Sequence, residues 1–147
     1  MISLRRSKRE ELETFDEMDR QDHARNFVIQ TGIESHQEYF DDPGITYLSI
    51  ENANAEFCGY FILVPEPDND SAEFRRILVD GRKRGIGQAA ISEMESYCKN
   101  EFGVNRIWLD VYEDNEIGIH VYEKLGYRRF GEECVDGRKL YLYEKAL

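Results

Sequence analysis

Two patterns of apolar and polar residues run along this chain, one with the period of a strand and one with the period of a helix. Short runs with apolar alternation or with β-branched and aromatic residues predict seven strands. They lie at Ile2–Arg5, Ile45–Glu51, Phe57–Val64, Ala72–Val79, Arg106–Val111, Tyr127–Glu132 and Lys139–Tyr143. Apolar residues three or four positions apart, such as Leu12, Phe15 and Met18, predict amphipathic helices. The predicted helices follow Ser7, Thr31, Gly85 and Asn115.

Cap and turn residues mark where these elements begin and end. Ser7-Lys-Arg-Glu10 and Thr31-Gly-Ile-Glu34 have the pattern of a capping box at a helix start, and Asp136-Gly137 is a strong hairpin turn. Neither a repeat nor a linker divides the chain, and Pro65–Asp70 is a turn cluster between two strands. The order β-α-α-β-β-β-α-β-α-β-β predicts one domain over residues 1–147, of the α/β or α+β class with a mixed sheet.

The overall charge excludes some classes of function. The chain has 147 residues with 30 Asp and Glu against 19 Lys and Arg, a formal net charge of −11. Such acidity argues against a nucleic-acid partner, because neutralising phosphates needs a basic face. No apolar run approaches the roughly 20 residues that cross a bilayer, and the N-terminus lacks an apolar leader. We therefore expect a cytoplasmic protein without a membrane partner.

Cysteines and histidines give little sign of chemistry. Cys58, Cys98 and Cys134 are odd in number and widely spaced, so we expect reduced thiols that mostly pack in the core. A nucleophilic role for one of them is the alternative. The three histidines lack the spacing of metal ligands, and we expect no metal.

The charge is unevenly distributed, and a basic segment leads into a glycine-containing helix start. Residues 75–84 hold five basic side chains and one acidic one, a charge of +4, which leaves −15 for the rest of the chain. Within this region a strand ends at Val79, a loop with Arg82, Lys83 and Arg84 follows, and a helix begins near Gly85 and Gly87. Unpaired amides at a helix start favour anions, and glycines allow close approach of the backbone. The segment suits a diphosphate.

Three interpretations of this segment compete. A Walker A loop is excluded because no Gly-Lys-Ser/Thr follows the first glycine. Gly85–Ala90 fits the loose GxGxxA form of a dinucleotide turn, but five residues separate Val79 from Gly85 and the surrounding order is largely antiparallel. A solvated basic turn at a helix start is the simplest alternative. The third interpretation is an acyl-CoA pyrophosphate loop.

Two sequence blocks carry a resemblance to a known family. Arg82-Lys-Arg-Gly-Ile-Gly87 matches the pattern [QR]-x-x-G-x-[GA], and Trp108-Leu-Asp-Val111, Asn115 and Val121-Tyr-Glu-Lys-Leu-Gly-Tyr127 form a second block at the expected separation. Together they resemble the GNAT superfamily of N-acetyltransferases, near its ribosomal-protein and spermidine acetyltransferase branch. The resemblance covers roughly Phe57 to the C-terminus. The loop before Gly85 is about two residues shorter than in many members, which should alter the route into the cradle.

The resemblance implies a fold and a co-substrate. The expected fold is a mixed, mostly antiparallel central sheet of about seven strands flanked by about four helices, and the expected co-substrate is acetyl-CoA. The backbone of Ile77, Leu78 and Val79 would pair with the pantetheine arm. Asn115 would contact the cofactor as well as cap its helix. The residues expected around the pyrophosphate are Arg82, Lys83, Arg84, Gly85, Ile86, Gly87 and Gln88.

The resemblance also assigns catalytic roles. Tyr122 would donate a proton to the departing thiolate, a role that suits a phenol; the alternative is a tyrosine that only packs. Glu73 is the first candidate for the general base, and an ion pair with Arg75 or Arg106 is its alternative. Asp110 and Glu113 come second, and water without a dedicated base also remains open.

The acceptor is the least determined part. The acidic stretch with Glu34, Glu38, Asp41 and Asp42 would favour a polycationic amine, or is an ordinary charged helix face. Aromatic residues could line the acceptor pocket or belong to the core; they are Tyr39, Phe40, Tyr141 and Tyr143. The sequence thus predicts an acetyl-CoA-dependent N-acetyltransferase acting on a primary amine of a small molecule, a polyamine or a protein N-terminus by direct attack in a ternary complex. An acyl-CoA-binding module without turnover is the alternative, and a homodimer is left open.

Overall fold

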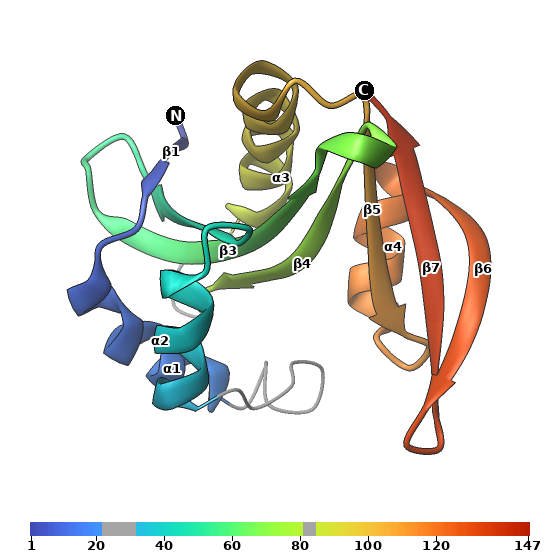
Figure 1. Ribbon diagram of the computed structural model, residues 1–147, viewed down its shortest axis with the longest axis horizontal. Helices are drawn as coiled ribbons and strands as arrows, with labels where there is room; N and C mark the ends of the chain where they lie inside the picture. The colour runs from blue at the N-terminus through green and yellow to red at the C-terminus, as the bar shows by residue number, and fades with distance from the viewer. Residues whose placement is uncertain (22–31, 81–84) are drawn as a thin grey trace.

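The computed structural model describes residues 1–21, 32–80 and 85–147, and its elements follow the predicted order (Figure 1). The helices are α1 (Leu12–Asp19), α2 (Ile33–Asp41), α3 (Gly87–Tyr97) and α4 (Glu116–Lys124). The strands are β1 (Ser3–Arg6), β2 (Thr46–Glu51), β3 (Phe57–Glu66), β4 (Ser71–Val79), β5 (Arg106–Tyr112), β6 (Arg128–Val135) and β7 (Arg138–Ala146). A π-helical turn extends α3 to Phe102, and Gly103 ends it with a φ of 67°. None of the described helices is long and apolar enough to cross a membrane.

The seven strands form a single sheet with one parallel pair. Their order is β1-β2-β3-β4-β5-β7-β6. Every neighbouring pair is antiparallel except β4 and β5, which run parallel. This arrangement confirms the predicted mixed, mostly antiparallel sheet. The parallel pair joins the two halves of the sheet, and α3 supplies its crossover.

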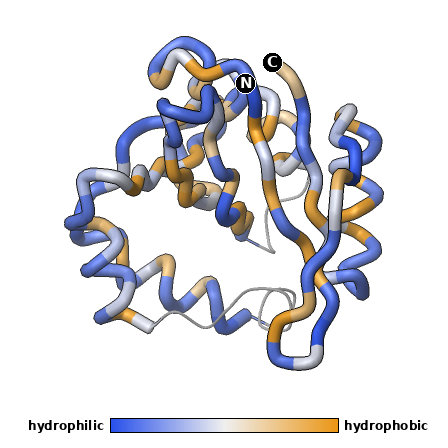
Figure 2. The backbone as a smooth tube through the Cα atoms, turned by 45° about the vertical axis from the view of Figure 1, so that its right-hand side comes forward, coloured by the Kyte–Doolittle hydropathy of each residue, from blue (hydrophilic) through white to orange (hydrophobic). Residues whose placement is uncertain are grey.

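A hydrophobic core lies on each face of the sheet. One core packs sheet residues such as Phe61 and Leu63 against α3 and α4, and the other packs Tyr60 and Ile62 against α1 and α2. These four residues are consecutive in β3, so alternation along a strand supplies both cores. Figure 2 shows how hydrophobic and hydrophilic positions mix along the strands and helices. The pairs α1–α2 and α3–α4 therefore lie on opposite faces.

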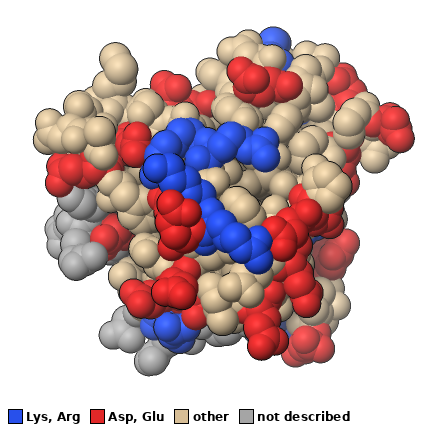
Figure 3. All heavy atoms as spheres, turned by 60° about the vertical axis from the view of Figure 1, so that its left-hand side comes forward, with Lys and Arg blue, Asp and Glu red and all other residues tan. Residues whose placement is uncertain are grey.

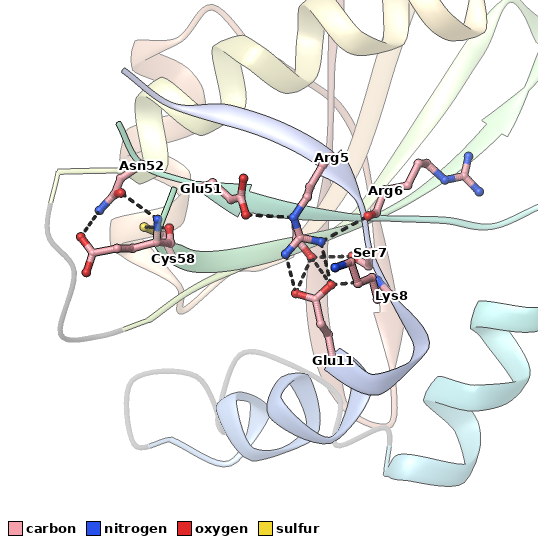
Figure 4. Close-up of polar contacts among 10 residues, drawn as sticks. Arg5, Arg6, Ser7, Lys8, Glu11, Glu51, Asn52 and Cys58 are labelled. Carbon is pink, nitrogen blue, oxygen red and sulfur yellow. Dashed lines mark hydrogen bonds and ion pairs between the residues drawn. The ribbon is translucent and has the colours of Figure 1, made fainter. Parts of the chain in front are cut away.

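An arginine anchors the start of α1 to the sheet. The Arg5 guanidinium donates to Glu51 at 2.9 Å and to both carboxylate oxygens of Glu11 at 2.8 and 2.9 Å (Figure 4). Glu11 also accepts the Lys8 backbone N–H at 2.8 Å. The predicted cap at Ser7 is wrong by one residue, because the buried Ser7 hydroxyl bonds to Ser49 at 2.8 Å instead.

The second predicted cap and the cysteines have different outcomes. Thr31 lies outside the described residues, and Gly32 is the N-cap of α2.

Cys58 and Cys98 are buried, Cys134 is exposed, and all three are free thiols as predicted. Burial raises the pKa of Cys98 to about 12, so this thiol stays protonated at neutral pH.

Candidate active site

The parallel strands β4 and β5 separate after three residue pairs. Their pairing runs from Ser71 opposite Arg106 to Glu73 opposite Trp108. Beyond this point β4 continues to Val79 and the two strands diverge (Figure 1). Among the described residues, the pairing of β4 with β5 does not extend beyond Glu73. An extended ligand with amide groups can bond to a strand edge as an added strand.

A β-bulge in β4 accompanies the separation. Phe74 lies opposite Leu63 and Arg76 lies opposite Ile62, so Arg75 is an extra residue on β4. A bulge bends its strand and increases the local twist. It also shifts the alternation, because Phe74 and Ile77 both pack on the α3–α4 side although three positions separate them. The bulge lies two residues after Glu73, the last residue of β4 that pairs with β5.

The start of α3 has the features of an anion site. Gly85 has a φ of 74°, which favours glycine, and α3 begins at Gly87 after the N-cap residue Ile86. The first turn of α3 has no acidic residue, and among the described residues no side chain caps it. Its first backbone N–H groups lack helical partners and carry the positive end of the helix dipole. Arg82, Lys83 and Arg84 lie outside the described residues.

The surroundings of Gly87 indicate whether a ligand can approach the start of α3. Its φ is not in the left-handed region, and no described atom lies within 4 Å of the Cβ that an alanine would add. Neither backbone strain nor packing within the described protein therefore requires a glycine here. A missing side chain leaves the amides of Gly87 and Gln88 open to approach, which fits a diphosphate group.

Tyr122 lies where the two strands separate. Its ring contacts Phe74 edge to face, with centroids 5.9 Å apart. Phe74 directly follows Glu73, the last residue of β4 that pairs with β5. Burial, and to a smaller extent the charge of Asp110, raises the pKa of Tyr122 to about 12. The phenol is therefore protonated at neutral pH and can donate a hydrogen bond. Asn115 caps the same helix by accepting the Gly118 N–H at 3.0 Å, as predicted.

The carboxylates of Glu73 and Asp110 lie on the α1–α2 face of the sheet, near the point where β4 and β5 separate. Leu109 and Val111 pack toward α3 and α4, so Asp110 between them points to the opposite face. Glu73 lies on that face as well, next to Phe74 of the α3–α4 core. Arg75 donates to the two Glu73 oxygens at 2.9 and 3.2 Å. The ion pair given as an alternative for Glu73 therefore exists, and its partner is Arg75; Arg106 bonds to Glu144.

Asp110 is held in an environment that disfavours its charged form. Burial, then the negative charges of Glu73 and Glu133, raise the pKa of Asp110, and Arg75 only partly opposes them. Sequence reasoning missed Glu133, whose place beside Asp110 depends on the β6–β7 hairpin folding back along β5. Glu113, the other second candidate, accepts the Tyr141 hydroxyl at 3.4 Å.

The candidate acceptor residues divide between the two faces. Tyr143 is buried in the α3–α4 core and donates to Glu123 of α4 at 2.7 Å, so it belongs to the core alternative. Tyr39 and Phe40 pack at the edge of the α1–α2 core. Tyr141 stacks under the Arg129 guanidinium at 4.1 Å.

One acidic residue of α2 has a basic partner. Asp41 forms an ion pair with Arg9. The chain from β1 to α1, on the left of Figure 1, carries further basic residues, and Figure 3 shows a band of Lys and Arg side chains between groups of Asp and Glu. The positive charge is thus not confined to residues 75–84.

Comparison with known proteins gives the family. A profile described as "Acetyltransferase (GNAT) family" matches residues 6–127. The spermine/spermidine N(1)-acetyltransferase of Bacillus subtilis (strain 168) is 27% identical over 88 residues, which are 56% of this chain and 58% of that relative. The matched region thus spans little more than half of the curated relative's length.

Solved structures agree with this family. The spermidine N-acetyltransferase from Vibrio cholerae in complex with CoA and spermine superposes with a TM-score of 0.84 at 17% identity, covering 99% of this chain and 95% of that chain. A dodecameric structure of spermidine N-acetyltransferase from the same organism gives a TM-score of 0.77 at 18% identity, covering 99% and 93%. These similarities confirm the predicted fold. The family profile agrees with the predicted class, an N-acetyltransferase with acetyl-CoA as its co-substrate. The chain belongs to the GNAT family of acetyltransferases.

Proposed function

We propose that the protein transfers the acetyl group of acetyl-CoA to a primary amine of a polyamine. The observation that carries this proposal is the separation of β4 and β5 beyond Glu73, with α3 on one face of the sheet and Glu73 and Asp110 on the other. The polyamine acetyltransferases among its relatives support the choice of acceptor. A cluster of carboxylates would attract such a cation.

The cofactor would lie on the α3–α4 side of this opening. The edge of Ile77, Leu78 and Val79 would bond to the two amides of the pantetheine arm, and residues 82–88 would hold the pyrophosphate. Asn115 would add a contact from the start of α4. When bound, acetyl-CoA supplies the thioester carbonyl that the amine attacks.

Tyr122 would act on the leaving sulfur. A phenol with a pKa of about 12 is a weaker acid than a thiol, whose ordinary pKa is about 8.5. Its contribution is therefore a hydrogen bond to the thiolate as the C–S bond breaks, and solvent supplies the proton that the sulfur finally holds. The raised pKa keeps this donor protonated throughout.

Asp110 would accept the ammonium proton, with Glu73 beside it. A base that receives a proton from an ammonium group works better when its own pKa is raised toward the working pH. The structure raises the pKa of Asp110, whereas the Glu73 carboxylate is occupied by Arg75. Glu73 would thus act through its charge on Asp110. The amine then attacks directly: the C–N bond forms as the C–S bond breaks, without a covalent enzyme intermediate.

The test is an acceptor panel with acetyl-CoA. Spermidine, spermine, a peptide with a free N-terminus and an aminoglycoside are compared by thiol release and product mass. We expect acetylation of the polyamines at the highest kcat/KM. CoA binding without acetylation of any amine would overturn the proposal in favour of a binding module, and a preference for the peptide or the aminoglycoside would overturn the choice of acceptor.

The role of Asp110 gives a pH prediction. Because folding raises its pKa, ionised Asp110 destabilises the protein as the pH rises through that pKa. Asp110→Asn should therefore unfold at higher urea concentration than wild type at pH 7, with the difference shrinking at pH 3, and should lose the acid limb of the pH profile of kcat/KM. A variant that is less stable at pH 7, or an unchanged acid limb, would contradict this role.

A further inference from the structure

A buried polar network lies between the sheet and the two helices α1 and α2. Asp19 and His36 are completely buried, and Nε2 of His36 lies 2.8 Å from Oδ2 of Asp19. The Tyr60 hydroxyl donates to Oδ1 of Asp19 at 2.5 Å, and Nη1 of Arg76 donates to Oδ2 at 3.2 Å. Nδ1 of His36 lies 2.7 Å from the Tyr47 hydroxyl. The network therefore connects α1, α2, β2, β3 and β4.

The hydrogen bonds indicate where the protons are. An ionised Asp19 only accepts, so Nε2 of His36 carries the proton between them. Nδ1 then accepts from the Tyr47 hydroxyl. The positive charge of Arg76 offsets the negative charge of Asp19. Asp16, Asp19 and His36 bring possible ligand atoms within 4.8 Å of one another. The direct bond between Asp19 and His36, and Arg76 on the same oxygen, favour a hydrogen-bond network over a cation site.

His36 is the main attachment of α2 to the rest of the protein. Within α2, which is described in full, it is the one buried residue, and Ile33, Tyr39 and Phe40 are only partly buried. Its ring also meets the Tyr47 ring edge to face, with centroids 5.8 Å apart. Directional bonds to a histidine specify the position of a helix more narrowly than apolar contacts do.

The network is connected to the candidate acceptor side. Arg76 follows the bulged residue Arg75, whose guanidinium holds Glu73. The hydrogen bond that Arg75 donates to Glu73 is the largest cause of the raised pKa of Arg75, and the electrostatic effect of Tyr39, one turn after His36, adds to it. The position of α2 thus affects the electrostatic surroundings of Arg75 through Tyr39.

We propose that His36 is a positioning residue for the amine acceptor. By bonding to Asp19, and through it to Arg76, it fixes α2 so that Tyr39 forms a wall of the acceptor site opposite the bulge. The proposal rests on the proposed function. It places the effect on the amine and not on acetyl-CoA, because α3 and α4, which are proposed to contact the cofactor, lie on the other face of the sheet.

The test compares three variants. His36→Leu removes both ring hydrogen bonds, whereas His36→Gln keeps an N–H donor toward Asp19. Phe15→Leu is the matched control, because Phe15 is buried in the same core and stacks on Tyr60 at 4.2 Å without bonding to the network. We expect His36→Leu to raise KM for spermidine about tenfold, the loss of a hydrogen bond to a charged group. KM for acetyl-CoA should stay within about twofold for all three variants, and His36→Gln should recover most of the loss.

Hydrogen exchange gives a readout that does not need turnover. Backbone amides of residues 33–41 should exchange about tenfold faster in His36→Leu than in wild type or Phe15→Leu. If wild type acetylates no amine, the proposed function fails while exchange still decides the role of His36. Unchanged exchange, an unchanged KM for spermidine, or an equal rise in Phe15→Leu would overturn the proposal. If His36→Leu does not fold, Tyr47→Phe decides, with an expected rise in exchange and KM of about threefold and no rise as the contrary result.

Discussion

Gly59 is the position where the smallest change should do most harm to the candidate cofactor edge. It lies in β3 opposite Val79 at the end of β4. A Cβ on Gly59 would stand 2.3 Å from the Leu78 carbonyl oxygen and 2.9 Å from the Val79 Cα. Real Cβ atoms essentially never come closer than 3.0 Å, so Gly59→Ala must move β3 or β4 by about 0.7 Å. Both neighbours are backbone atoms, and no side-chain rotation can make room.

The expected cost follows from this geometry. Overpacking a well-packed site costs about 1–3 kcal/mol. Replacing glycine reduces the entropy of the unfolded chain, which offsets about 0.4–1 kcal/mol of that cost. We therefore expect Gly59→Ala to lower the free energy of unfolding by about 1–2 kcal/mol. Because the displaced residues are the end of the edge proposed for the pantetheine arm, CoA affinity should also fall by about tenfold, or about 1.4 kcal/mol.

Gly131→Ala is the matched control for this experiment. Gly131 is also in a strand, but its added Cβ would meet the end of the Leu142 side chain at 3.3 Å, which can rotate away. Urea unfolding should give a change within about 0.5 kcal/mol, and calorimetry should give an unchanged CoA affinity. If Gly59→Ala matched Gly131→Ala in both measurements, the close approach of β3 to β4 would not exist as described.

Three further predictions concern single side chains. Tyr122→Phe should lower kcat about a hundredfold in steady-state kinetics with CoA affinity within about twofold, and near-normal kcat would remove Tyr122 from its role. Gly87→Glu should abolish CoA binding in calorimetry while leaving the urea midpoint near wild type. The fold should tolerate the change because no described atom lies within 4 Å of the new Cβ and because an acidic residue suits a helix start. Retained CoA binding would refute the pyrophosphate site at the start of α3. Burial raises the pKa of Glu11, but hydrogen bonds from Arg5 and the Lys8 N–H outweigh it, so the pKa is lowered below its ordinary 4.5. Glu11→Gln should therefore lower the free energy of unfolding by about 1–3 kcal/mol at pH 7, and urea titrations should show this difference vanishing as the pH falls below 4.5; a constant difference would contradict it.

The elements of the fold were readable from local patterns, whereas the shape of the active site was not. Each strand and helix has its own apolar period, and glycines such as Gly103 mark ends that the structure confirms. The bulge at Arg75 has no local signal, because the Arg76 side chain is held by Asp19, 57 positions earlier in the chain. The separation of β4 from β5 similarly depends on a register of only three pairs between distant segments.

His36 illustrates why a residue can escape sequence reasoning altogether. As a sequence letter it is one of three isolated histidines. Its partners Tyr47 and Asp19 lie 11 and 17 positions away, on a strand and on another helix. No spacing rule links residues across such elements. Only the packing of α1 and α2 against each other and against β2 brings the three together.

The general base is another residue that the sequence alone does not identify. Glu73 and Asp110 are both carboxylates near the point where β4 and β5 separate. A motif that resembles a family can favour either of them as the general base. What separates them is Arg75: the bulge brings its guanidinium onto Glu73, while Asp110 keeps the negative charges of Glu73 and Glu133 nearby. Burial, and then these like charges, raise the pKa of Asp110, which favours it as the proton acceptor in the proposed mechanism. The two carboxylates would therefore have different roles because one extra residue in β4 gives them different neighbours.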